Sequence, residues 1–88
     1  MKIFSILGCG WLGFELAKSF KNDFFVKVSS RDIEKMDLYK DEGLSPFLLN
    51  ENNFEFLDDL LDTNYLFINF PPSKFDDYIS FLEKIFSP

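Results

Sequence analysis

The amino-acid sequence predicts an α/β domain with three layers, in which helices cover both faces of a short parallel sheet. Apolar runs at residues 2–7, 24–28 and 65–70 are typical of strands that are buried on both faces. Stretches with helical periodicity separate these runs, so strands and helices alternate along the chain. Alternation of this kind favours parallel strands joined by right-handed crossovers. We therefore predict a sheet with strand order 3-2-1-4.

The first half of the chain predicts two strands, each followed by a helix. Residues 2–7 form a short, mostly apolar run that ends at a glycine. Residues 11–21 place apolar side chains four positions apart, which predicts a helix with one packing face. Residues 24–28 are aromatic and β-branched and predict the second strand. A second, more polar helix is expected over 32–42, because its first turn is acidic and Gly43 stands where a C-terminal cap belongs.

The second half predicts a short edge strand, a short helix, a buried strand and a final helix. Residues 46–49 begin with a proline, which is tolerated at the start or the edge of a sheet. One or two helical turns are expected at three spaced apolar residues, Phe54, Leu57 and Leu61. The apolar run 65–70 is stopped by two prolines. Residues 73–76 have the Ser-x-x-acid form of a capping box and precede an amphipathic helix.

Size and composition limit the class of protein. The 88 residues include 13 Phe and are 47% hydrophobic, so the chain can build a core but fits one domain at most. The net charge of −6 argues against binding to nucleic acids or anionic membranes, and no stretch is long enough to span a bilayer. With one cysteine and no histidine, we expect no disulfide, no metal site and a cytoplasmic location. Cys9 lacks an imidazole to activate it and is interpreted as a small loop residue.

A Gly-x-Gly-x-x-Gly loop follows the first predicted strand and opens the first predicted helix. This context is typical of the dinucleotide-binding loop of Rossmann-like folds. Gly8 permits a tight turn, Gly10 lets the backbone approach a pyrophosphate, and Gly13 allows the helix and the strand to pack closely. Leu12 and Trp11 complete the loop. The Trp11 ring suits two roles equally well, covering the cofactor phosphates or packing beneath a second domain.

The residues after the second strand bear on which cofactor is bound. NAD-specific sites usually carry an acidic residue there, which binds the ribose hydroxyls, whereas the 2′-phosphate of NADP needs a cation. Here the sequence places Ser30 and Arg31. The guanidinium of Arg31 is a forked, charged donor suited to phosphate, and Ser30 adds a hydroxyl donor, so NADP is favoured. If Asp32 occupied the ribose position instead, its carboxylate would repel the 2′-phosphate and NAD would be the cofactor.

The end of the last predicted strand borders the same crevice. Ligands of open α/β sheets bind beyond the carboxyl ends of the strands, so Asn69, Phe70 and Pro71 are expected to contact the cofactor through their backbone. Simple termination of the strand is an equally good interpretation of these residues. The predicted cofactor-binding residues are thus Gly8, Gly10, Trp11, Leu12, Gly13, Ser30, Arg31, Asn69, Phe70 and Pro71.

Residues 6–13, 30–31 and 69–72 together resemble the start of bacterial NAD(P)-dependent epimerase/dehydratase-like proteins, which are atypical members of the extended short-chain dehydrogenase/reductase superfamily. That superfamily normally carries a catalytic Tyr-x-x-x-Lys pair, whose lysine lowers the tyrosine pKa and orients the ribose. Four positions after the three tyrosines this chain has Gly43, Asn69 and Leu82. The resemblance therefore implies a cofactor site, and we assign no catalytic residue.

A complete Rossmann fold contains two βαβαβ halves, and residues 1–88 cover little more than one. We interpret the chain as the N-terminal half of an NAD(P)-binding domain, truncated relative to the full domain, and expect about 150 further residues in an intact enzyme. The leading hypothesis is the cofactor-binding part of an NADP-dependent oxidoreductase or nucleotide-sugar epimerase, inactive alone. The alternatives are a non-catalytic nucleotide sensor or regulatory module, and a domain that has lost its ligand and serves in assembly.

Self-association is also expected. The strand at 65–70 would lie at an open sheet edge, which is a template for pairing with another chain. Phe81, Ile85 and Phe86 widen the apolar face of the final helix beyond what a half-size sheet covers. We therefore expect a homodimer formed through the sheet edge or the last helix.

Overall fold

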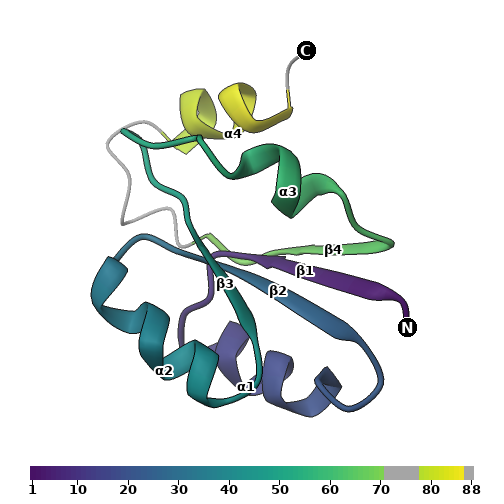
Figure 1. Cartoon of the computed structure of the whole chain (residues 1–88). Helices are drawn as coiled ribbons and strands as arrows, with labels where there is room; N and C mark the ends of the chain where they lie inside the picture. The colour runs from purple at the N-terminus through teal and green to yellow at the C-terminus, as the bar shows by residue number, and fades with distance from the viewer. Residues whose placement is uncertain (71–77, 87–88) are drawn as a thin grey trace.

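The computed structural model describes residues 1–70 and 78–86, which form one four-stranded parallel sheet with helices on both sides (Figure 1). The strands are β1 (Ile3–Leu7), β2 (Phe25–Ser30), β3 (Ser45–Leu48) and β4 (Tyr65–Ile68). They lie in the order β3-β2-β1-β4, so the predicted strand order is confirmed. In the register of the sheet, Ser5 on β1 pairs with Lys27 on β2 and with Leu66 on β4.

Helices cover both faces of the sheet, as the alternating pattern predicts. On one face lie α1 (Trp11–Phe20) and α2 (Met36–Asp41), and on the other lie α3 (Leu57–Leu61) and α4 (Tyr78–Phe86) (Figure 1). A single 3₁₀ turn, η1 (Ile33–Lys35), precedes α2. Gly43 follows α2 with a φ of +84°, the left-handed conformation that a C-terminal cap requires. The three-layer, Rossmann-like α/β fold is confirmed.

Each face of the sheet has its own apolar core. The cluster beneath α1 and α2 consists of Ile6, Cys9, Ala17, Val26, Val28, Tyr39 and Leu44. Aromatic rings extend this cluster, because Phe4 stacks on Phe20 with 5.0 Å between ring centroids and meets Phe24 edge-on at 5.6 Å. The cluster beneath α3 and α4 consists of Leu7, Leu49, Leu60, Phe70, Phe81 and Ile85. Burial of this aromatic and aliphatic surface is the main favourable term in the free energy of folding.

The final helix is covered more completely than its sequence predicts. The prediction that Phe81 and Ile85 contribute to an exposed patch is wrong, since these side chains are only 3% and 4% exposed. Phe81 packs edge-on against Phe70, with 5.0 Å between ring centroids, and Leu60 of α3 lies in the same cluster. Leu60 of the short helix α3 and Phe70 thus provide part of the cover. Of the expected patch, Phe86 remains half exposed.

Several element boundaries differ from the predicted ones, and β3, for example, spans Ser45–Leu48 rather than residues 46–49. The sequence predicts that the second strand ends at residue 28, but β2 continues through Ser30. The polar side chains of its last two residues are satisfied there, because the Ser29 hydroxyl accepts the Gly8 amide and the Ser30 hydroxyl bonds to the backbone of Asp32. The helix predicted over 32–42 is divided into η1 and α2. β4 ends at Ile68, two residues before the predicted end. The capping box predicted at residues 73–76 lies outside the described residues.

A buried lysine joins the sheet to α3. Lys27 lies in the middle of β2 and is buried beneath that helix. Its Nζ donates hydrogen bonds to the carbonyl oxygens of Asp59, at 2.6 Å, and Asp62, at 3.0 Å. These carbonyls belong to the C-terminal turn of the helix, where a cation is favoured by the helix dipole and by the unpaired acceptors. The charge therefore fixes the end of α3 over the sheet.

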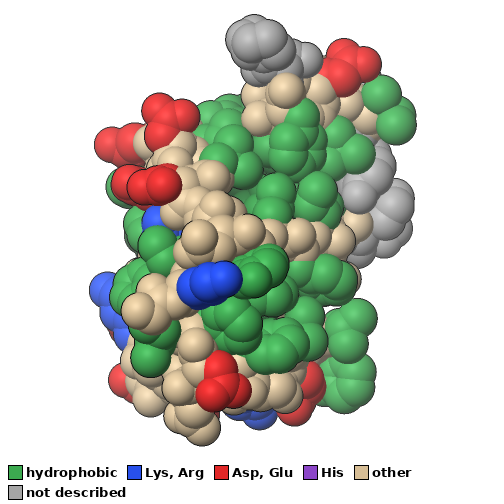
Figure 2. Space-filling model, turned by 90° about the vertical axis from the view of Figure 1, so that its right-hand side faces the viewer, with side chains coloured by type: hydrophobic (Ala, Val, Ile, Leu, Met, Phe, Trp, Pro, Cys, Tyr) green, Lys and Arg blue, Asp and Glu red, His purple; other side chains and the backbone are tan. Residues whose placement is uncertain are grey.

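β4 forms an apolar edge of the sheet. In the described part of the chain it pairs with β1 alone, and its residues Tyr65, Leu66 and Ile68 are about two-fifths to one-half exposed. Figure 2 views the end of the molecule at which the strands begin, and it shows hydrophobic side chains gathered over a broad area. None of the described helices has the length and apolarity needed to cross a membrane.

Candidate functional site

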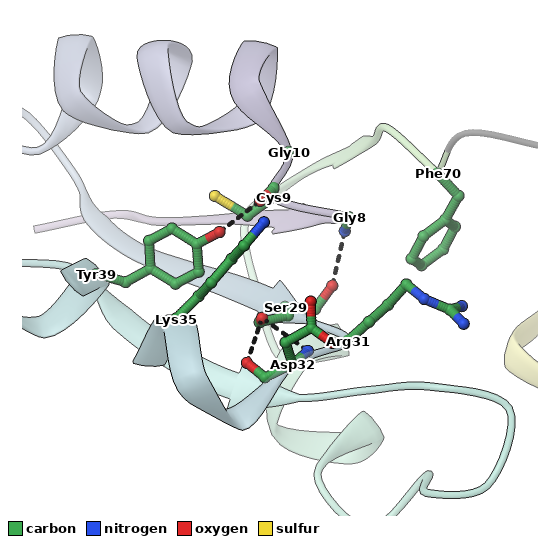
Figure 3. Close-up of a pocket in the computed structure, with 10 residues that line it drawn as sticks. Gly8, Cys9, Gly10, Ser29, Arg31, Asp32, Lys35, Tyr39 and Phe70 are labelled. Carbon is green, nitrogen blue, oxygen red and sulfur yellow. Dashed lines mark hydrogen bonds between the residues drawn. The ribbon is translucent and has the colours of Figure 1, made fainter. Parts of the chain in front are cut away.

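A cavity of about 340 Å³ opens at the carboxyl ends of the central strands (Figure 3). It is lined by Gly8, Cys9, Gly10, Ser29, Ser30, Arg31, Asp32, Lys35, Tyr39 and Phe70. These residues come from the loop after β1, the end of β2, the turn into α2, α2 itself and the segment after β4. The carboxyl ends of parallel strands are where open α/β sheets bind their ligands.

The glycine loop is held against the end of β2 by its own amides. Gly8 has a φ of +87°, and its amide donates to the Ser29 hydroxyl at 2.7 Å. The Cys9 amide donates to the Ser29 carbonyl at 3.0 Å, and the Gly10 amide donates to the Gly8 carbonyl at 3.0 Å. All three amides are therefore engaged within the protein. The amides of Trp11, Leu12 and Gly13 begin α1 and have no intrahelical acceptor.

The other two glycines of the motif differ in the space around them. A Cβ atom at Gly10 would meet no described atom within 4 Å, so the backbone there borders open space. A Cβ at Gly13 would lie 3.2 Å from the Gly8 carbonyl oxygen and 3.3 Å from a methyl carbon of Ile6. Gly13 thus allows α1 to pack closely on β1, and Gly10 leaves room for a group outside the loop.

Cys9 and Tyr39 form the inner wall of the cavity. The Tyr39 hydroxyl donates to the Cys9 carbonyl at 2.6 Å and so ties the glycine loop to α2. Burial raises the pKa of the Cys9 thiol to about 11. Burial, followed by the proximity of Cys9, raises the pKa of Tyr39 to about 12. Both groups are protonated at neutral pH, which agrees with the interpretation of Cys9 as a structural loop residue rather than a nucleophile.

The last serines of β2 are engaged within the protein. Ser30 is only 5% exposed, and its hydroxyl donates to the Asp32 carbonyl at 2.8 Å and accepts from the Asp32 amide at 3.1 Å. The Ser29 hydroxyl receives the Gly8 amide. Ser30 therefore orients the turn that carries Arg31 and Asp32, and its hydroxyl proton is already used.

Arg31 is paired with an acidic residue from the turn after β3. Both terminal nitrogens of its guanidinium bond the two carboxylate oxygens of Glu51, with 3.0 Å between Nη2 and Oε2. Hydrogen bonding to Arg31 lowers the pKa of Glu51. Asn50 reinforces this arrangement, because its side-chain amide donates to the Arg31 carbonyl at 3.4 Å and its side-chain oxygen accepts the Asn52 amide at 2.8 Å. The guanidinium thus lines the cavity with two of its donors already occupied.

Lys35 is a second cation of the cavity. It ends η1, and Figure 3 shows its side chain reaching toward Cys9 and Gly10, whereas the Arg31 side chain extends toward Phe70. Its positive charge acts to lower the pKa of Cys9, against the larger effect of burial. Sequence reasoning missed Lys35. Its spacing of four residues from Arg31 at the start of a predicted helix was the available signal.

The structure brings together half of the predicted cofactor-binding residues. Those that line the cavity are Gly8, Gly10, Ser30, Arg31 and Phe70. Gly13 is buried beside them, and Asn69 holds the loop, because its side-chain amide donates to the Gly8 carbonyl at 3.2 Å. Trp11 is 80% exposed, and neither it nor the half-exposed Leu12 lines the cavity. Pro71 lies outside the described residues.

Asp32, considered in the sequence as the residue that would favour NAD, also lines the cavity, together with the residues Cys9, Ser29, Lys35 and Tyr39. The cavity therefore holds cationic and anionic side chains close to one another. Within residues 1–70 and 78–86, no cluster of three or more metal-ligating side chains occurs.

Comparisons with known proteins provide information about the fold and not about the function. No protein-family model matches the chain, and no curated protein matches its sequence. A solved structure of a functionally unknown conserved protein from Silicibacter pomeroyi is similar, with a TM-score of 0.65 and 16% sequence identity. The match covers 96% of this chain and 29% of the other, so the chain spans under one-third of that protein. The chain shares its α/β fold with part of a larger protein.

Proposed function

We propose that the chain is the N-terminal half of an NAD(P)-binding domain and that it holds the adenosine end of NADP. The observation that carries this proposal is the open space at Gly10, inside a cavity formed by the glycine loop and the end of β2. A backbone without a side chain at this point admits the phosphates of a dinucleotide. The enclosing protein would be an oxidoreductase or a nucleotide-sugar epimerase, in keeping with the resemblance of the loop and its flanking residues.

The size and chemistry of the cavity suit one end of such a cofactor. Its volume of about 340 Å³ lies near the lower limit of small-molecule sites, which is about 300 Å³, and matches a nucleotide better than a whole dinucleotide. Phe70 supplies an apolar wall, and Arg31 and Lys35 supply positive charge. When bound, the nicotinamide ring of the cofactor supplies hydride transfer, and the residues described here bind and orient the adenosine end.

The choice between NADP and NAD depends on Arg31 and Asp32. The guanidinium of Arg31 lines the cavity and bonds both carboxylate oxygens of Glu51. A 2′-phosphate bound beside Arg31 would compete with the Glu51 carboxylate for the N–H donors of the guanidinium. NAD is the alternative cofactor, and the Asp32 carboxylate in the same cavity favours it.

Titration of the chain with NADP and NAD tests the proposal. Arg31→Ala is expected to weaken NADP by about 1.5–3 kcal/mol, or roughly tenfold to a hundredfold, because a charge-assisted contact with the 2′-phosphate is lost. NAD, which lacks that phosphate, should change much less. As the matched variant, Glu51→Gln keeps the turn but removes the competing charge, so it should strengthen NADP binding. Equal losses for both cofactors in Arg31→Ala would show that Arg31 is not the phosphate ligand, and absence of binding by the unaltered chain would overturn the proposal.

We further propose that two copies of the chain associate through β4. The open backbone of an edge strand favours strand addition, and the half-exposed side chains of this strand would be buried in the contact. Light scattering at high concentration should show a dimer. Ile68→Lys places a charge on the edge and should shift the equilibrium toward monomer, whereas Leu38→Lys, on the exposed side of α2, should leave it unchanged. A strict monomer at high concentration would contradict association through this edge.

A further inference from the structure

The glycine loop has fewer amides to offer a phosphate than its sequence motif implies. The amides of Gly8, Cys9 and Gly10 are bonded to Ser29 and to the loop itself. A phosphate seated at Gly10 would therefore depend on the first amides of α1 and on whatever cation lies beside the loop. The structure provides such a cation from the opposite side of the cavity.

Lys35 and Arg31 differ in their ion pairs with other residues of the protein. Arg31 bonds both oxygens of Glu51, and its side chain extends toward Phe70 (Figure 3). The Lys35 ammonium has no ion pair or hydrogen bond with any other residue among 1–70 and 78–86, and it reaches toward the glycine loop (Figure 3). An ammonium is a compact charge with three donors, which suits the non-bridging oxygens of a phosphate.

We propose that Lys35 is the cation that binds the 5′-phosphate of a nucleotide at Gly10, in place of the loop amides that the protein uses internally. This inference rests on the proposed function, since it assigns a further binding residue to the same cavity. The proposal assigns the two cations of the cavity to two different phosphate groups of the cofactor. Lys35 holds the phosphate that all adenine dinucleotides share, whereas Arg31 faces the one that distinguishes NADP from NAD.

The charge of Asp32 bears on this assignment. Its carboxylate lines the same cavity and would repel a phosphate, so a cation that offsets this repulsion favours binding of an anion. Glu51 does not offset Lys35, because it is held by Arg31. Lys35 is thus the positive group that reaches toward the glycine loop, and its removal leaves the repulsion from Asp32 without this compensation.

Binding measurements with the 88-residue chain test the inference, using 5′-AMP, NAD, NADP and adenosine as ligands. Lys35→Gln removes the charge and keeps the length of the side chain. We expect about tenfold or greater weakening of 5′-AMP, NAD and NADP alike, because one charge-assisted contact to a common phosphate is lost. Adenosine, which has no phosphate, should bind as it does to the unaltered chain. Lys40→Gln is the matched control, because Lys40 is exposed on α2 and does not line the cavity.

The possible outcomes lead to different conclusions. A shared loss confined to the phosphorylated ligands in Lys35→Gln, with none in Lys40→Gln, would establish the assignment. A loss for NADP alone would place Lys35 at the 2′-phosphate and overturn it, as would unchanged binding or an equal loss in the Lys40 control. If the unaltered chain bound none of the four ligands, the proposed function itself would fail. Unfolding curves of both variants would show that the comparison is made between folded proteins.

Discussion

Replacement of Gly8 by alanine is expected to lower the free energy of unfolding by about 2–5 kcal/mol, a large part of the stability of a domain of this size. Gly8 has a φ of +87°, where a residue with a Cβ is strained by about 1–2 kcal/mol. The new Cβ would also lie 2.8 Å from the Asn69 carbonyl oxygen and 2.9 Å from the Phe70 ring. Backbone atoms cannot move aside as a flexible side chain can, so overpacking adds about 1–3 kcal/mol. Urea unfolding measures the effect.

Gly43→Ala is the matched control for this prediction. Gly43 has nearly the same φ, +84°, but the nearest atom to an added Cβ is the side-chain carbon of Lys21 at 4.0 Å. The conformational strain is then present without the steric clash, and a loss of about 1–2 kcal/mol is expected. Similar losses in the two variants would mean that the approach of Asn69 and Phe70 to the loop contributes nothing to stability.

Gly10→Phe is expected to abolish nucleotide binding and to leave the fold intact. Gly10 has a φ of −84°, which any residue adopts, and an added side chain would project into open space. That space is where the proposed function seats a phosphate, so an aromatic ring there would exclude the ligand. Titration with NADP, NAD and 5′-AMP measures binding, and circular dichroism with thermal unfolding reports the fold.

A smaller substitution at the same position provides the control. Gly10→Ala adds a single methyl group and should weaken binding without abolishing it, since the cavity is much larger than a methyl group. A graded loss from glycine through alanine to phenylalanine indicates steric exclusion. Binding of the phenylalanine variant with the affinity of the unaltered chain would refute the assignment of the glycine loop to phosphate.

The strand order was predictable because it depends on local signals. Apolar runs of strand length, separated by helical periodicity, leave few arrangements once crossovers are right-handed. Gly8 and Gly43 both adopt the positive φ values that a turn and a helix cap predict. The boundary of β2 was less predictable, because Ser29 and Ser30 are polar residues whose burial depends on partners elsewhere in the chain.

The electrostatic environment of the cavity could not be predicted from the same signals. Glu51 reaches Arg31 across 20 residues of sequence, and nothing in its local context marks it as a partner. The approach of Tyr39 to the Cys9 carbonyl spans 30 residues and depends on how α2 packs against the sheet. Phe81 and Ile85 are buried in a cluster with Leu60 of α3 and with Phe70, and these tertiary contacts cannot be read from the periodicity of the helix alone.

The bonds from Lys27 to the end of α3 bear on the order in which the chain assembles. β1, α1 and β2 follow one another in sequence, so their contacts close short loops and form readily. The hydrogen bonds of Lys27, by contrast, form only when Asp59 and Asp62 are in place, and these residues are 32 and 35 positions further along the chain. Before these bonds form, the Lys27 ammonium remains hydrated, because burying an unpaired charge is costly. When α3 packs against the sheet, the Lys27 ammonium is desolvated and a long loop is closed in the same step. We expect this step, rather than formation of the first βαβ unit, to limit the rate of folding.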